Sequence, residues 1–154
     1  MKKTLIAWCL LVLLTLCLAG CQKNDAAVDG AAAPNPAVIQ EDHLAATKER
    51  SDALKAALEQ EALTQADMNQ KSEELRALWD EALEHLLDEA KKILPEAEAE
   101  QLTAEQSQWA ADTKAAVEAA GKEFEGGSIY PLIVNSEAAR LTEERVYKLY
   151  ELLK

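Results

Sequence analysis

The chain has 154 residues, and its 28 Asp and Glu residues outnumber its 16 Lys and Arg residues, for a formal net charge of −12. Nucleic acids are poor partners for so acidic a protein, because Lys and Arg contacts with phosphates supply most of that affinity. The same charge favours basic protein partners and argues against a basic surface that holds the chain on anionic lipid.

The first 21 residues have the layout of a secretory signal. Two lysines precede an apolar run over residues 5–18, which ends in the sequence Leu-Ala-Gly-Cys21. These last four residues resemble the lipobox of bacterial lipoproteins, which implies cleavage after residue 20 and a lipid on Cys21. The apolar run is shorter than the roughly 20 residues of a membrane-spanning helix. We therefore expect a signal peptide over residues 1–20.

Cleavage at this point changes both the charge and the cysteine content. It removes two of the 16 basic residues and none of the 28 acidic ones, so the mature charge is 14 − 28 = −14. Cys9 and Cys17 leave with the signal, and the lipid consumes Cys21. We therefore expect no disulfide in the mature protein, and its fold must be stabilised by packing alone.

Residues 21–40 are expected to hold the lipidated cysteine and a flexible linker, since they lack an apolar period and contain Gly30, Pro34 and Pro36. Residues 41–154 are expected to form an all-α domain, an antiparallel bundle of about four helices. The first helix, over about 42–63, is rich in good helix formers, but its apolar stripe is thin.

The second helix carries the strongest periodic signal. Thr64 and Asp67 have the spacing of a capping box, and Pro95 is expected to end or kink the helix. Between them an apolar stripe repeats every three or four residues. Its members are Met68, Ser72, Leu75, Trp79, Ala82, Leu86, Ala90 and Ile93.

Two more helices are expected after Pro95. Thr103 and Gln106 form a second candidate capping box, and Gly126-Gly127 are expected to stop the helix that follows it. Ser128 is a candidate cap for the last helix, with Pro131 near its first turn. No segment shows the alternation of a strand.

Four short motifs in residues 64–154 resemble, in order and spacing, those of the LprI-type lysozyme-inhibitor domain, a family of small helical domains in secreted bacterial proteins. They are Thr-Gln-Ala-Asp-Met-Asn, Gln-x-x-Trp, Gly-Gly-Ser with a following proline, and Leu-Thr-x-x-Arg. Most of their residues also have a structural explanation, as core, cap or helix stop. The motif residues are Met68, Asn69, Gln106, Trp109, Gly126, Gly127, Ser128, Pro131, Thr142 and Arg145.

The sequence also departs from this family. Cysteines that the family carries correspond here to Lys71, Val117 and Ser136, and the family's Arg-Asp after the tryptophan is replaced in the region 112–114. Losing a disulfide typically costs about 2–5 kcal/mol. The long second stripe and the additional first helix are expected to offset that loss.

The sequence offers no basis for catalysis. His43 and His85 are the only histidines, and no Ser/His/Asp or Cys/His set can be assembled. Glu81, His85 and Glu89 share a helix face and are the one candidate metal set, but with so many glutamates a solvated face is the favoured interpretation. We expect no enzyme activity, no cofactor and no metal.

Two functions from different classes follow. The resemblance implies a lipid-anchored, non-enzymatic binding protein of the cell envelope that inhibits lysozyme or a similar basic wall hydrolase. The alternative is a structural or scaffolding lipoprotein that acts through helix–helix contacts, which the long second stripe favours. Gln22 follows Cys21 where an inner-membrane retention signal has Asp, so we expect an outer-membrane anchor with the domain in the periplasm. The oligomeric state stays open.

Overall fold

The computed structural model describes residues 36–60 and 62–154, with side chains from Glu41 onward. No strand occurs in these residues, so the all-α prediction is confirmed; the predicted signal peptide and Cys21 lie outside them. The elements are α1 (Pro36–Leu58), α2 (Gln65–Ile93), α3 (Glu96–Gly121), a short 3-10 helix η1 (Lys122–Phe124) and α4 (Tyr130–Leu153).

The first helix starts earlier than expected. α1 begins at Pro36, inside the segment assigned to the linker, and it ends at Leu58 instead of near residue 63. Proline is favoured in the first turn of a helix, because its fixed φ suits the helix and the donor it lacks has no partner there. α1 therefore takes in the last five residues of the segment assigned to the linker.

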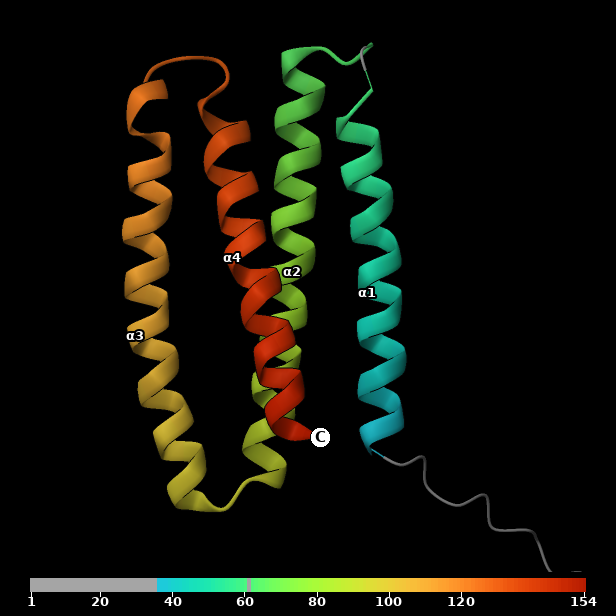
Figure 1. The fold of residues 1–154 in the computed structure, drawn as a ribbon, viewed down its shortest axis with the longest axis vertical. Helices are drawn as coiled ribbons and strands as arrows, with labels where there is room; N and C mark the ends of the chain where they lie inside the picture. The colour runs from blue at the N-terminus through green and yellow to red at the C-terminus, as the bar shows by residue number, and fades with distance from the viewer. Residues whose placement is uncertain (1–35, 61) are drawn as a thin grey trace, which may run out of the picture. The chain divides into compact units, whose positions relative to one another are not determined.

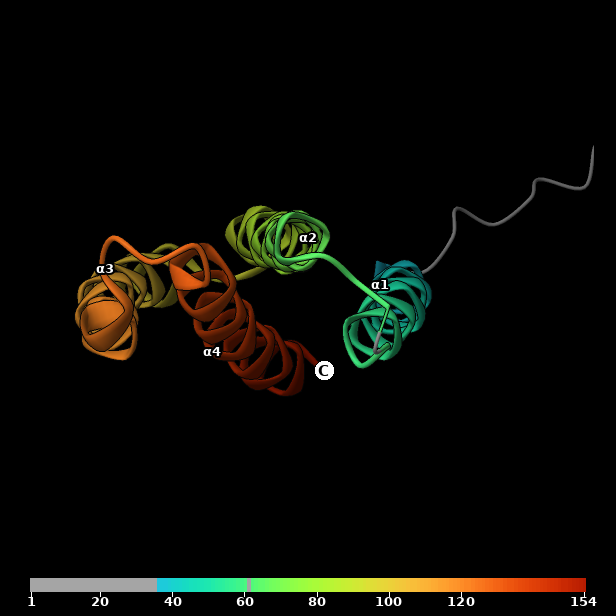
Figure 2. The same ribbon diagram turned by 90° about the horizontal axis from the view of Figure 1, so that it is seen from above.

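Successive helices run in opposite directions, as predicted for an antiparallel bundle (Figure 1). As a result α2 and α4 run in the same direction, and these two form the most extensive helix pair. α1 packs on α2 and α3 packs on α4, so the central pair is flanked on both sides (Figure 2). α2 and α3 make only slight contact with each other.

The core lies along the central pair. Trp79 of α2 is completely buried, and it packs against Tyr147 of α4 with ring centroids 5.8 Å apart. The predicted α2 stripe is confirmed over most of its length, although Met68 is half-buried and Ile93 is 48% exposed. The buried members of the stripe are Ser72, Leu75, Trp79, Ala82, Leu86 and Ala90.

The ends of α2 agree with the predictions. The Asp67 amide donates to Thr64 Oγ1 at 3.2 Å, and the Thr64 amide donates to Asp67 Oδ2 at 3.0 Å, which completes the capping box. Thr64 also holds the pKa of Asp67 below its usual value, because its hydroxyl and amide both donate to the charged carboxylate. α2 ends at Ile93, two residues before Pro95.

The predicted start of the third helix is wrong. α3 begins at Glu96, so Thr103 lies inside it and its hydroxyl donates to the Ala99 carbonyl at 2.8 Å. Pro95 stops α2 and directly precedes α3. Glu96 and Glu98 in the first turn of α3 stabilise this start, because their negative charges lie near the positive end of the helix dipole. A capping box needs backbone amides that have no partner within the helix. The amides near Thr103 lie in the interior of α3 and already have such partners.

The predicted end of the third helix is also wrong. α3 stops at Gly121, five residues before the Gly126-Gly127 pair. A Cβ at Gly121 would lie 2.6 Å from Val134 Cγ1 and 2.7 Å from Tyr130 Cε2, so glycine permits the close approach of α4 there. Gly126 has a φ of +76°, which serves the following turn and not a helix end.

Ser128 does not cap the last helix. α4 begins at Tyr130 after Ile129, and no side chain caps it. Pro131 lies in its first turn, as predicted. The carbonyl of Ser128, and not its hydroxyl, makes a contact with α2, in which it accepts a hydrogen bond from Asn69.

Candidate functional site

A groove lies between α2 and α3, with α4 as its floor. It has a volume of about 410 Å³ and exists because α2 and α3 each pack on α4 but barely on each other. Trp109 of α3 and Thr142 of α4, two residues of the predicted motifs, line it. Trp109 is half-buried, so the expectation of a core tryptophan is met only in part.

The charges on the rim of this groove are balanced. Arg76 Nε lies 3.4 Å from Asp80 Oδ2, and Lys114 Nζ lies 3.8 Å from Glu118 Oε1. The Thr142 hydroxyl donates to Asp80 Oδ1 at 3.3 Å, which ties the floor to the rim. With each carboxylate beside a cation, the groove does not concentrate the negative charge of the protein.

Gln106 and Arg145, from two different motifs, meet between α3 and α4. Arg145 is only 6% exposed, and its Nε donates to Gln106 Oε1 at 3.0 Å. Burial lowers the pKa of Arg145, and the nearby Glu105 carboxylate partly opposes that shift. Arg145 Nη2 is buried and has no partner within the described residues. Gln106 therefore links two helices, and its predicted role as a cap is wrong.

A second pair of motifs meets at the start of α2. Asn69 Nδ2 donates to the Ser128 carbonyl at 2.9 Å and so holds the α3–α4 loop against α2. The Gly127 amide donates to the Phe124 carbonyl at 3.0 Å within that loop. Asn69 also accepts from Gln65 Nε2 at 2.9 Å. These contacts favour a structural role for this half of the motif set.

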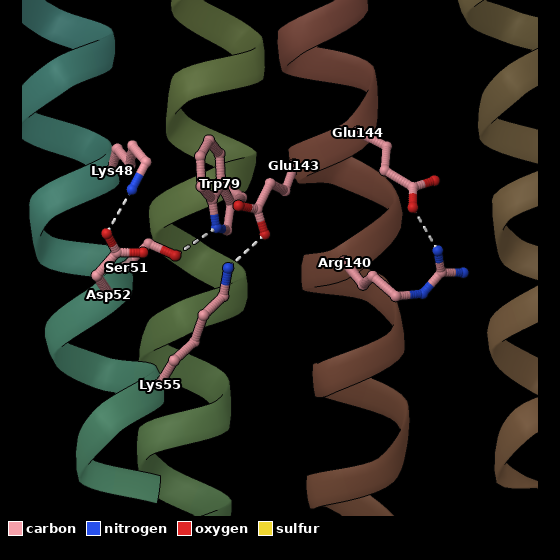
Figure 3. Close-up of polar contacts among 8 residues, drawn as sticks. All are labelled: Lys48, Ser51, Asp52, Lys55, Trp79, Arg140, Glu143 and Glu144. Atoms are coloured by element: carbon pink, nitrogen blue, oxygen red, sulfur yellow. Dashed lines mark hydrogen bonds and ion pairs between the residues drawn. The ribbon is translucent and has the colours of Figure 1, made fainter.

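α1 is attached to the central pair through the site shown in Figure 3. The Trp79 indole Nε1 donates to Ser51 Oγ at 3.1 Å, and both side chains are completely buried. Lys55 Nζ, also on α1, lies 2.6 Å from Glu143 Oε2 on α4. The Ser51 hydroxyl oxygen therefore satisfies the buried indole N–H as its hydrogen-bond acceptor.

The candidate metal residues do not converge. The His85 ring stacks on His43 of α1, with centroids 4.3 Å apart and an angle of 9° between the planes. Glu89 accepts from Lys92 at 2.6 Å, and this bond lowers the pKa of its carboxyl group. Glu81 is exposed. Over residues 36–60 and 62–154, no three His, Cys, Asp or Glu side chains are placed to hold a metal ion.

The family model for the lysozyme inhibitor LprI matches residues 55–149, more than half of the chain. The chain belongs to the LprI family. Neither curated proteins nor solved structures gave a significant match. The LprI match contains α2, α3, most of α4 (to Leu149) and the last four residues of α1. It thus covers the groove, both motif contacts and Trp79, whereas Ser51 and His43 lie outside it.

Sequence reasoning missed several of the side-chain partners described above. The Arg76–Asp80 pair has an i, i+4 spacing that could have been noticed. The Gln106–Arg145 and His43–His85 contacts join residues about 40 apart, and nothing local marks them. None of the described helices is long and apolar enough to cross a membrane.

Proposed function

We propose that this protein is a lipid-anchored, non-enzymatic member of the LprI family that inhibits lysozyme or a similar basic wall hydrolase in the periplasm. The family match over residues 55–149 carries the proposal. The lipid on Cys21 and the outer-membrane location rest on the lipobox and on Gln22.

The charge of the protein supports a basic target. A net charge of −12, or −14 after signal cleavage, steers a basic enzyme toward the protein and raises association rates by about 10- to 1,000-fold at low salt. The scaffolding alternative loses its main support, because the α2 stripe that motivated it is used inside the bundle. Leu75, Trp79 and Leu86 are each buried there.

The direct test is an inhibition assay. Clearing of purified peptidoglycan by lysozyme is followed with and without the full-length protein in non-ionic detergent. We expect inhibition at micromolar protein that weakens steeply as salt rises. An unrelated acidic protein of similar net charge serves as the control. Unchanged turnover at low salt, or equal inhibition by the control, would contradict the proposal.

The anchor has its own test. In cells that express the full-length chain and are given labelled palmitate, Cys21→Ser should abolish both incorporation of the label and the processing that depends on it. Cys17→Ser is a matched control within the signal and should leave both unchanged. Equal behaviour of the two variants would rule out the lipid on Cys21.

A further inference from the structure

α2 ends, α3 begins and α4 ends at the same end of the bundle (Figure 1). Residues of these three segments line an apolar pocket. Its volume is about 330 Å³. Leucines from all three segments line it: Leu94, Leu102, Leu149, Leu152 and Leu153. Leu102 and Leu149 belong to the core, so the pocket is an extension of the core that opens to solvent.

Part of the apolar lining of this pocket is exposed to solvent. Leu152, which lines the pocket, is 64% exposed, the highest value among the large hydrophobic residues that the structure describes. Apolar residues of α4 therefore continue past Leu149, the last of its buried core residues. An apolar side chain from a partner could lie here without displacing any residue of the bundle.

The rim of the pocket is acidic. Glu98 and Glu105 stand on α3 and are both exposed. No Lys or Arg occurs from Glu96 to Thr113, and three lysines at this end of the bundle pair elsewhere. Those pairs are Lys91 with Asp88, Lys92 with Glu89 and Lys154 with Glu151. Arg145 lies within electrostatic reach of Glu105 but directs its Nε to Gln106.

From this combination we propose that the pocket, rather than the α2–α3 groove, is the docking surface for a basic protein and receives a lysine or arginine side chain from it. The methylene stem of such a side chain lies on leucines, and its charged head reaches Glu98 and Glu105. The groove lacks this chemistry, because cations already pair with its rim carboxylates. The inference rests on the proposed function, which supplies the basic partner.

The experiment compares two charge-matched variants of the full-length protein. Glu98→Gln/Glu105→Gln removes two carboxylates from the pocket rim, and Glu123→Gln/Glu125→Gln removes two exposed ones beside the α3–α4 loop at the opposite end. Both change the net charge by +2, so long-range steering falls equally. Binding of lysozyme and of a hexa-arginine peptide is measured by calorimetry at low salt, and thermal unfolding confirms that both variants are folded.

We expect the rim variant to raise the Kd at least tenfold, and the control pair to change it less than threefold. Leu152→Ala, at an exposed position, is expected to raise the Kd about threefold. Equal weakening by both charge pairs would show that only net charge acts and would overturn the proposal. Unchanged affinity in both Leu152→Ala and the rim variant would also overturn the proposal. A dimer that Leu152→Ala converts into a monomer, detected by light scattering, would overturn it too, because a second copy of the chain would then occupy the pocket.

The two probes separate this inference from the proposed function. In one outcome, the wild type and the control pair bind hexa-arginine, the rim variant does not, and the wild type does not bind lysozyme. This outcome would support the pocket and overturn the lysozyme-directed function. Lysozyme binding and inhibition that the rim variant retains in full would support the function and overturn the pocket. Binding of neither probe to the wild type would overturn both.

Discussion

Removing the hydrogen bond from Trp79 to Ser51 tests how α1 is held on the LprI domain. Both side chains are completely buried, and the bond is 3.1 Å long. Ser51→Ala removes one oxygen atom and leaves the indole N–H without an acceptor. A buried donor in that state costs about 1–3 kcal/mol. At about 4 °C per kcal/mol for a unit of this size, Tm should fall by about 4–12 °C.

The measurement is thermal and urea unfolding followed by circular dichroism. Ser107→Ala is the matched control, because Ser107 is exposed and bonds only to the Thr103 carbonyl in its own helix. It should change stability by less than about 0.5 kcal/mol. A double-mutant cycle of Ser51→Ala with Trp79→Phe should give a coupling energy of about 1 kcal/mol. A coupling near zero, or equal effects of the two serine variants, would refute the reasoning.

Three other features of the bundle make predictions of the same kind. Burial lowers the pKa of His43, so the unfolded state binds more protons near the ordinary value of 6.5 and stability falls as pH drops from about 7.5 to 5.5. His43→Gln should flatten that fall in urea unfolding. Arg145→Ala should cost about 2–4 kcal/mol in urea unfolding, through a cavity and an unpaired Gln106, whereas Arg145→Met/Gln106→Leu should cost less than about 1 kcal/mol. Gly121→Ala should lower the free energy of unfolding in thermal melts by about 1–3 kcal/mol, because its Cβ would meet Val134 at 2.6 Å.

Each of these has an outcome that contradicts it. For His43 the contradicting outcome is a dependence of the unfolding free energy on pH that His43→Gln leaves unchanged. His85 and Glu81, which face His43 from α2, act on its pKa in opposite directions. For Arg145 it is a double variant as unstable as the alanine variant. For Gly121 it is a gain of about 1 kcal/mol, which helix propensity alone predicts.

Sequence reasoning succeeded where the signal is local. The capping box at Thr64, the break at Pro95 and the α2 stripe each depend on residues a few positions apart, and the structure confirms all three. The prediction of a second capping box failed because Thr103 and Gln106, although correctly spaced, lie inside α3. This helix begins at Glu96, directly after Pro95. Spacing alone cannot tell a free helix end from a helix interior.

The candidate sites were harder to predict for a physical reason. The pocket needs the ends of three helices, and Leu94, Glu98 and Leu152 become neighbours only after the bundle forms. Nothing in the sequence distinguishes the exposed Leu152 from the buried Leu149 one turn earlier. The Gln106–Arg145 contact likewise depends on packing that no local pattern records.

The parallel central pair has a consequence for how the chain folds. α2 and α4 supply most of the core, yet the whole of α3 and its loop separates them in sequence. Closing that long segment costs entropy before any α2–α4 contact forms, and non-local contacts of this kind slow folding. A nascent chain therefore cannot complete its core until α4 has left the ribosome. Until then the apolar face of α2 has no α4 to cover it, so the unfinished chain exposes the surface that later becomes its core.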